Sequence, residues 1–127
     1  MLHQFIQHVV ADIVEMYKKS TNPSILVDVG TIRFNLRALV EELVEASDLP
    51  FFTTPMGKGA LDEDHKNFCG VYFGSVSEEH VQERFDSSDF VMIIGGLKTD
   101  FNSGSFSYRV PVNQTVELHS DHIKVQC

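Results

Sequence analysis

The segment His119-Ser120-Asp121-His122 brings two imidazoles and a carboxylate together within four residues. This i, i+3 spacing could offer ligands to a metal such as zinc. The flanking residues, however, are typical of a strand end, and a metal site normally needs three or four converging protein ligands. We therefore interpret the segment as a strand and its turn, and we predict no metal site in this chain. Cys69 and Cys127 form no CxxC pair and are predicted to be free thiols.

Two glycine patterns that could hold phosphate are incomplete. Gly57-Lys58-Gly59 is followed by Ala60 and Leu61, whereas a phosphate-binding P-loop needs GxxxxGK[ST] between a strand and a helix. A dinucleotide site needs GxGxxG after the first strand, because the pyrophosphate approaches the backbone closely. The turn after the first predicted strand contains only Gly30. Both patterns therefore favour structural turns over nucleotide binding.

Residues for nucleophilic or acid–base catalysis are also missing from this sequence. Gly104-Ser105-Phe106-Ser107 has the wrong spacing for a GxSxG nucleophile elbow and lies in a predicted loop. The neighbouring acids at 62–64 and 78–79 are typical of solvated surfaces and helix starts. We predict no catalytic and no cofactor-binding residue in this chain.

Length and charge narrow the classes of partner. With 127 residues, 43% of them hydrophobic, the chain can bury one substantial core and is expected to form one domain. Its net charge of -8 repels nucleic acid and anionic bilayers, so neither is an expected partner. The start Met1-Leu2-His3-Gln4 lacks the features of a secretory signal, and we expect the parent protein to be cytoplasmic.

Hydrophobic periodicity predicts three helices. Residues 2–19 carry an apolar stripe at helical spacing that ends before Pro23. Residues 32–46 carry a second stripe. Ser75-Val76-Ser77-Glu78 is interpreted as a capping box that opens a third helix, which buries Val81 and Phe85.

Strands are predicted at 24–29, 50–55, 90–94 and 115–119. Because strands alternate with helices, the predicted fold class is α/β: a Rossmann-like, doubly wound parallel sheet with helices on both faces, in a single domain. Strands 24–29 and 90–94 are too apolar to face water and are expected at the centre. A closing helix is expected at 124–127, so we expect the sequence to be truncated at its C-terminus.

Four strings in order carry a family resemblance. They are Phe52-Thr53-Thr54-Pro55-Met56-Gly57-Lys58-Gly59, Gly70-Val71-Tyr72-Phe73-Gly74, Thr99-Asp100-Phe101-Asn102-Ser103-Gly104-Ser105-Phe106-Ser107-Tyr108 and Glu117-Leu118-His119-Ser120-Asp121-His122. With them, the chain resembles the central domain of fungal-type pyruvate decarboxylases over most of its length. Each string is weak individually, but together and in this order they are specific.

The resemblance implies that residues 1–127 are the central, regulatory and connecting domain of a three-domain lyase. Such an enzyme converts pyruvate to acetaldehyde and carbon dioxide with thiamine diphosphate and magnesium, and it forms dimers or tetramers. In the family, the cofactors and catalytic residues belong to the other two domains. The isolated chain is therefore expected to be inactive and to bind neither cofactor.

The resemblance also assigns one site residue, because Arg33 matches the arginine that binds activating pyruvate. A guanidinium fork pairs bidentately with a carboxylate. The sequence departs from the family pattern at Gly30, where activated members carry a cysteine, and at Phe34, where they carry a histidine. An ordinary exposed arginine at a helix start is the alternative interpretation of Arg33.

Two further interpretations stay open at this point, because a fold does not determine a function. One is a stand-alone Rossmann-like module that binds a nucleotide such as FAD or ADP, as the equivalent domain does in related thiamine enzymes. The other is a domain whose surfaces mainly serve subunit assembly.

Overall fold

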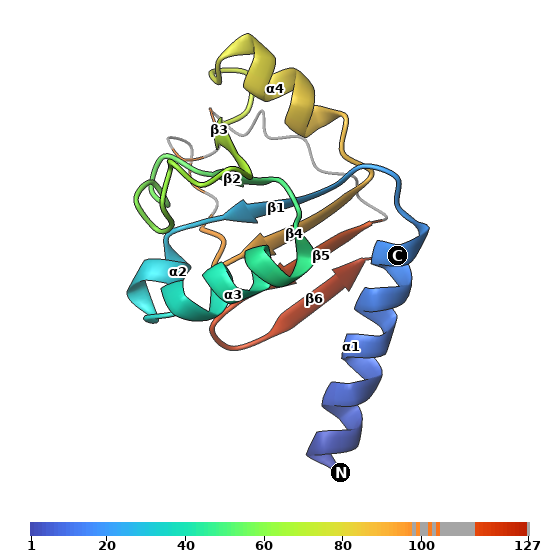
Figure 1. The fold of residues 1–127 in the computed structure, drawn as a ribbon. Helices are drawn as coiled ribbons and strands as arrows, with labels where there is room; N and C mark the ends of the chain where they lie inside the picture. The colour runs from blue at the N-terminus through green and yellow to red at the C-terminus, as the bar shows by residue number, and fades with distance from the viewer. Residues whose placement is uncertain (98, 100–101, 103, 105–113, 127) are drawn as a thin grey trace.

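The computed structural model describes residues 1–97, 99, 102, 104 and 114–126. One sheet of six strands, in the order β3-β2-β1-β4-β5-β6, forms its centre (Figure 1). The first five strands in this order are parallel, and β6 is antiparallel to β5. The strands are β1 (Pro23–Val27), β2 (Phe51–Thr53), β3 (Phe68–Val71), β4 (Phe90–Ile94), β5 (Thr115–Leu118) and β6 (Ile123–Gln126).

The two most apolar strands lie side by side at the centre of this sheet. β1 pairs with β4 along its whole length, from Pro23 opposite Phe90 to Val27 opposite Ile94. Ile25, Leu26 and Val27 are completely buried. The prediction that these two strands are central, and the predicted α/β fold class, are confirmed.

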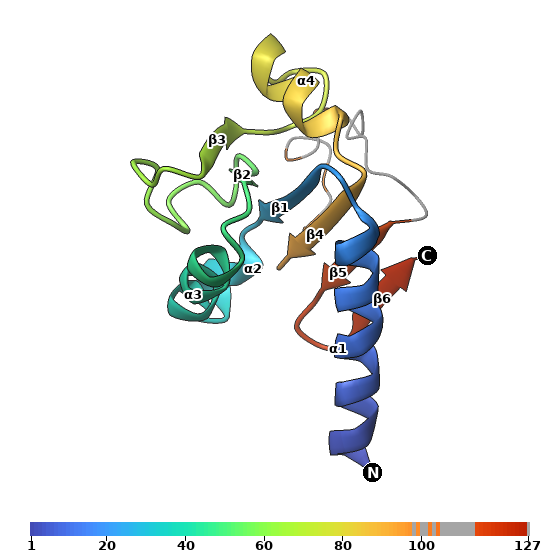
Figure 2. The ribbon, with the colours of Figure 1, turned by 45° about the vertical axis from the view of Figure 1, so that its right-hand side comes forward.

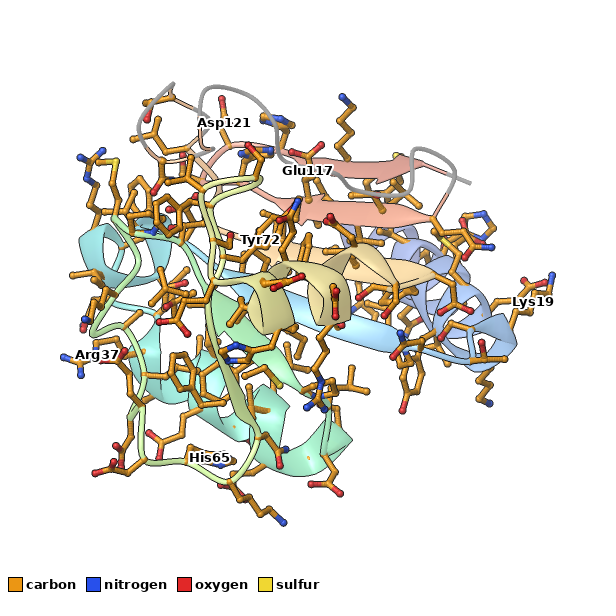
Figure 3. The ribbon with its side chains drawn as sticks, turned by 90° about the horizontal axis from the view of Figure 1, so that it is seen from above. Lys19, Arg37, His65, Tyr72, Glu117 and Asp121 are labelled. Carbon is orange, nitrogen blue, oxygen red and sulfur yellow. The ribbon has the colours of Figure 1, made fainter. Side chains whose placement is uncertain are left out.

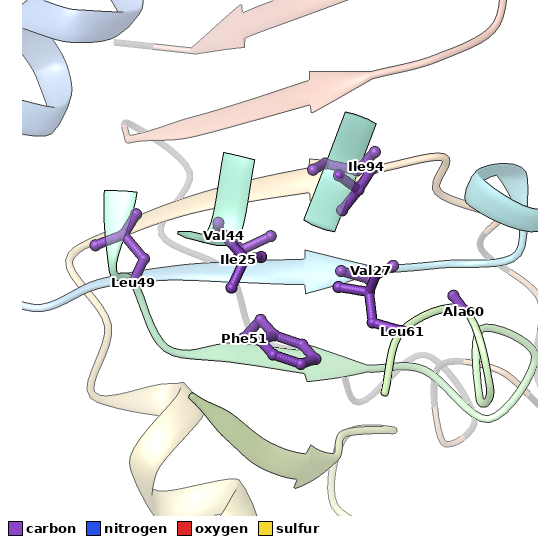
Figure 4. Close-up of a cluster of buried hydrophobic side chains, with 9 residues drawn as sticks. Ile25, Val27, Val44, Leu49, Phe51, Ala60, Leu61 and Ile94 are labelled. Atoms are coloured by element: carbon purple, nitrogen blue, oxygen red, sulfur yellow. The ribbon is translucent and has the colours of Figure 1, made fainter. Parts of the chain in front are cut away.

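One face of the sheet is covered by α3 (Arg37–Ser47), and the short helix α2 (Gly30–Arg33) lies beside it after the end of β1 (Figure 1). Val40 and Val44 of α3 pack onto alternate strand residues in a continuous apolar cluster (Figure 4). The cluster comprises Ile25, Val27, Val40, Val44, Leu49, Phe51, Ala60, Leu61 and Ile94. Side chains alternate between the two faces of a strand, which is why Leu26 is absent from this cluster.

The opposite face is covered by α4 (Glu79–Asp86), which lies across the sheet from α3 (Figure 2). Its Val81 and Phe85 pack against the alternate set of strand residues, which includes Leu26 and Phe52. The rings of Tyr72 and Phe85 stack with centroids 3.8 Å apart. Burial of Val81 and Phe85 confirms the predicted apolar side of this helix.

The helix α1 (Leu2–Lys19) extends away from the sheet (Figure 1). The exposed fraction of its apolar residues falls from 72% at Leu2 to 39% at Val14. Only near its C-terminal end does it meet the sheet, where the Tyr17 ring lies edge-on to Phe90 with centroids 6.2 Å apart. The predicted amphipathic helix is therefore present, and most of its apolar side faces solvent.

Three local predictions are wrong. The helix predicted over 32–46 is interrupted, because Asn35 has a left-handed φ of 55° and the Leu36 N–H donates back to the Thr31 carbonyl at 2.9 Å. The predicted capping box does not form: α4 begins at Glu79, and the Ser77 hydroxyl instead accepts from the Phe73 N–H at 2.8 Å.

The third wrong prediction is the closing helix at the end of the chain, because residues 123–126 form the strand β6. The short strand predicted over 50–55 spans 51–53, and β3 was not predicted. Most of the loop predicted over 95–113 lies outside the described residues.

Candidate functional site

The order in which strands are added to the sheet reverses between β1 and β4. From β1 the chain proceeds outward to β2 and β3, and it then returns to the other side of β1 as β4. In open α/β sheets, ligands bind in the crevice at such a switch point. The first residues after β1 and β4 are therefore the place to look for a site.

Gly30 and Gly95 approach each other closely at this switch point. The Gly30 N–H donates to the Gly95 carbonyl at 2.9 Å. A β-carbon on Gly30 would lie 2.5 Å from the Gly95 Cα, and one on Gly95 would lie 2.6 Å from the Gly30 Cα. Glycine at position 30 is therefore explained by close approach to a neighbouring strand end, and not by an unusual backbone turn.

Beside this contact lies a cavity of about 220 Å³, which we call the Arg33 pocket. Three separate segments line it, and they follow β1, β4 and β5. The lining residues are Val29, Gly30, Arg33, Phe34, Gly95, Gly96, Leu97, His119, Ser120 and Asp121. The structure thus brings Arg33 together with the histidine segment, although they are far apart in the sequence.

Arg33 is exposed, and the described residues offer no hydrogen-bond or ion-pair partner to its guanidinium. His119 and Asp121 line the same pocket. The hydrogen bond with the His122 ring, at 2.6 Å, and the charge of that ring hold the pKa of Asp121 below its usual value. Asp121 lies in the turn between β5 and β6, and Figure 3 labels it together with Glu117 of β5. The pocket therefore combines a guanidinium that forms no ion pair with a described residue and one ionised carboxylate at its edge.

The two histidines at 119 and 122 form a stacked pair, with ring centroids 4.3 Å apart and an angle of 17° between the ring planes. The Nε2 of His119 lies 3.4 Å from Glu117 Oε1. Among the residues that the structure describes, no three His, Cys, Asp or Glu side chains converge to hold a metal ion.

Directly before the pocket-lining Val29, the carboxylate of Asp28 is completely buried and accepts hydrogen bonds from three loops. Its Oδ1 accepts from the Val29 N–H and the Thr54 hydroxyl, both at 2.6 Å. Its Oδ2 accepts from the Leu97 N–H at 3.0 Å and from the Asn102 amide at 2.9 Å. We call Asp28, Thr54, Leu97 and Asn102 the Asp28 cluster.

The Asp28 cluster explains why two strings of the family resemblance occur together. Asn102 is completely buried, and its Oδ1 accepts from the Met56 N–H at 2.9 Å. A β-carbon on Gly57 would lie 2.5 Å from the Val27 carbonyl oxygen, so only glycine fits there. Residues 54–57 and Asn102 therefore pack together at the end of β1.

Sequence reasoning did not predict the Asp28 cluster. Its only signal was an aspartate directly after the aliphatic run 25–27, where a buried strand ends. A buried carboxylate is tolerated only when hydrogen bonds satisfy it. The partners Thr54, Leu97 and Asn102 lie 26, 69 and 74 residues from Asp28 in the chain, and nothing in the sequence pairs them with it.

Other features of the described chain show no further chemistry. Cys69 is a free thiol, as predicted, and burial raises its pKa. Cys127 and most of the Gly104–Ser107 segment lie outside the described residues. No helix in the described part of the chain is both long enough and apolar enough to cross a membrane.

Comparisons with known proteins agree with this fold. Residues 10–126 match the family model "Thiamine pyrophosphate enzyme, central domain". Pyruvate decarboxylases of Kluyveromyces marxianus and Candida glabrata are 44% and 43% identical over 118 residues. Pyruvate decarboxylase isozyme 2 of Saccharomyces cerevisiae is 43% identical over 118 residues.

In each of these three comparisons the match covers 93% of this chain and 21% of the relative. The chain thus spans about a fifth of the length of the curated relatives that it matches. Since the family model covers nearly the whole chain, this protein belongs to the central-domain family of thiamine pyrophosphate enzymes.

Proposed function

We propose that this chain is the central domain of a pyruvate decarboxylase, a carbon–carbon lyase that converts pyruvate to acetaldehyde and carbon dioxide. The parent subunit has three domains, assembles into dimers or tetramers in the cytoplasm, and uses thiamine diphosphate with magnesium. This domain connects the two cofactor-binding domains and is inactive alone. The family match and the pyruvate decarboxylase relatives support this proposal.

Within that enzyme, we propose that the Arg33 pocket binds pyruvate as an activator. The observation that carries this proposal is the position of Arg33 at the switch point, in a pocket where no described residue neutralises its guanidinium. A guanidinium offers two parallel N–H groups to a carboxylate. The glycines at 30, 95 and 96 add no side chain to their parts of the pocket wall, which leaves room for a small ligand.

The size of the pocket favours a small acid over a nucleotide. Its volume of about 220 Å³ lies below the roughly 300–1,000 Å³ of sites for larger organic ligands. A three-carbon 2-oxo acid needs much less room than FAD or ADP. The pocket also lacks the glycine-rich helix start that binds pyrophosphate, since Gly30 is followed by Thr31 and Ile32.

The test is the pyruvate dependence of the steady-state rate in the full-length enzyme that contains this chain. Arg33→Ala removes a charge-assisted hydrogen-bonding group worth about 1.5 to 3 kcal/mol. We expect it to raise the pyruvate concentration that half-activates the enzyme roughly tenfold or more. Arg33→Lys should restore only part of the activation, because an ammonium keeps the charge but loses the planar fork.

Arg84→Ala is the matched control, because Arg84 is an exposed arginine of α4, on the other face of the sheet. It removes the same charge and should leave activation unchanged. A hyperbolic rate curve in the unmodified enzyme, or a sigmoidal curve that Arg33→Ala does not move, would show that Arg33 is an ordinary surface residue.

A further inference from the structure

We infer that the buried Asp28 cluster positions the walls of the Arg33 pocket, so that Asn102 controls the affinity for the carboxylate ligand without touching it. This inference rests on the proposed function of the pocket. Asn102 is a positioning residue in this proposal, because it is completely buried and does not line the pocket.

The Asp28 carboxylate joins two of the three segments that line the pocket. One oxygen accepts from the Val29 N–H at 2.6 Å, on the segment that leads to Gly30 and Arg33. The other oxygen accepts from the Leu97 N–H at 3.0 Å, on the segment that follows β4. A single side chain thus sets the separation of two pocket walls.

Asn102 completes this arrangement through its side-chain amide. Its amide donates to both Asp28 oxygens, at 3.0 and 2.9 Å, and also to the Leu97 carbonyl at 2.9 Å. Both backbone polar groups of Leu97 are therefore held by the pair Asp28 and Asn102. Since Leu97 lines the pocket, its position depends on an amide that the ligand never meets.

Loss of the Asn102 amide removes the donor to the Leu97 carbonyl and one of the donors to each Asp28 oxygen. Buried polar groups that lose a partner move toward water or another partner. We expect Leu97 to be the residue that shifts, because Asp28 and Thr54 directly follow the paired strands β1 and β2 and stay joined by their hydrogen bond. We therefore expect the part of the pocket lined by residues 95–97 to shift relative to Arg33.

The experiment uses the full-length enzyme and compares Asn102→Ala with the unmodified protein over a range of pyruvate concentrations. We expect the half-activating concentration to rise about fivefold or more, the size of effect seen for residues that act on a site indirectly. The maximal rate at saturating pyruvate should change far less. If both parameters fall together, or neither changes, the inference is wrong.

A second comparison separates positioning from a general loss of stability. On the Arg33→Ala background, Asn102→Ala should cause little further loss of activation, because the group that the wall positions is already gone. Additive losses in the double variant would overturn the inference. Should Asn102→Ala fail to fold, Thr54→Val removes one donor to Asp28 with the same side-chain shape, and a smaller shift of the same kind is expected.

The matched control is Ser88→Ala, which removes a buried hydrogen bond of 2.7 Å to Ser24 near the opposite end of β1. It should lower the melting temperature without moving the half-activating concentration. If the unmodified enzyme gives a hyperbolic curve, the proposed function fails. If the curve is sigmoidal and Arg33→Ala flattens it while Asn102→Ala does not, only the inference about the Asp28 cluster fails.

Discussion

Asp121 places a negative charge at the edge of a pocket that we propose to bind an anion. It lines the Arg33 pocket, and the His122 ring holds its pKa below the usual value, so it is ionised at neutral pH. A carboxylate ligand meets repulsion from Asp121 and attraction from Arg33. If the pocket binds an activating carboxylate as proposed, the charge of Asp121 is expected to weaken that binding and to shift activation to higher ligand concentrations.

Replacement of Asp121 by Asn should strengthen activation by pyruvate. Surface charge pairs are worth about 0.2–1 kcal/mol, so we expect the half-activating concentration to fall by a factor of about 1.5 to 5. The effect should shrink in 0.5 M salt, because added ions screen exposed charges. Asp64→Asn, on the exposed loop between β2 and β3, is the control of equal charge. Weaker activation in Asp121→Asn would mean that Asp121 binds the ligand or orients His122.

Among the elements, α1 is held to the sheet at one end only. The Asp89 carboxylate, just before β4, accepts from the Thr21 N–H at 2.7 Å, the Thr21 hydroxyl at 2.9 Å and the Asn22 N–H at 2.8 Å. Burial alone would raise the pKa of Asp89, but these hydrogen bonds outweigh burial and lower it. The link between α1 and the sheet thus depends on an ionised side chain.

This link should fail in acid. Because the pKa of Asp89 is lower in the folded state, the stability that it contributes is fully present above the unfolded value of about 3.9 and is lost as the pH falls through the folded value. Asp89→Asn should lower the free energy of unfolding at pH 7, since an amide can accept at only one of its two polar atoms. Urea unfolding from pH 7 to pH 3 tests this. The difference between the two proteins should narrow below about pH 4, and a constant difference would contradict it.

The elements also show what the sequence could and could not predict. The central strands and α4 follow from long apolar runs and helical stripes, whose signal is local. The break at Asn35 depends on a left-handed residue and a hydrogen bond back to Thr31, which the continuous apolar stripe concealed. β6 was missed because the strand exists only through its pairing with β5, in which Lys124 lies opposite Glu117, and the sequence of 123–126 alone does not show that pairing.

For the whole molecule, the candidate site could be predicted only in part. Arg33 was identified through the family resemblance, and the strand order then places it beside His119. The residues that line its pocket come from three separate segments, and such convergence depends on the sheet order and not on local spacing. The same argument explains why the Asp28 cluster was not predicted.

The nucleotide-binding alternative makes a prediction for the whole chain. A ligand that binds only the folded state at 100 times its dissociation constant stabilises it by about 2.7 kcal/mol. Given the small pocket and the single glycine after β1, we expect FAD, ADP and NAD to leave the melting temperature of the 127-residue chain unchanged. A rise with ADP or FAD, absent with an equal concentration of sodium sulfate, would favour the nucleotide-binding alternative.

The packing of Gly57 and Asn102 at the end of β1 also changes what the family strings mean in evolution. Thr54, Gly57 and Asn102 belong to those strings, yet their contacts serve burial of Asp28 and close approach of backbones. Selection for a folded domain is enough to keep them, whether or not the parent enzyme still turns over pyruvate. In a descendant that has lost its catalytic residues, these strings should therefore persist. Their presence then indicates common ancestry and does not indicate activity.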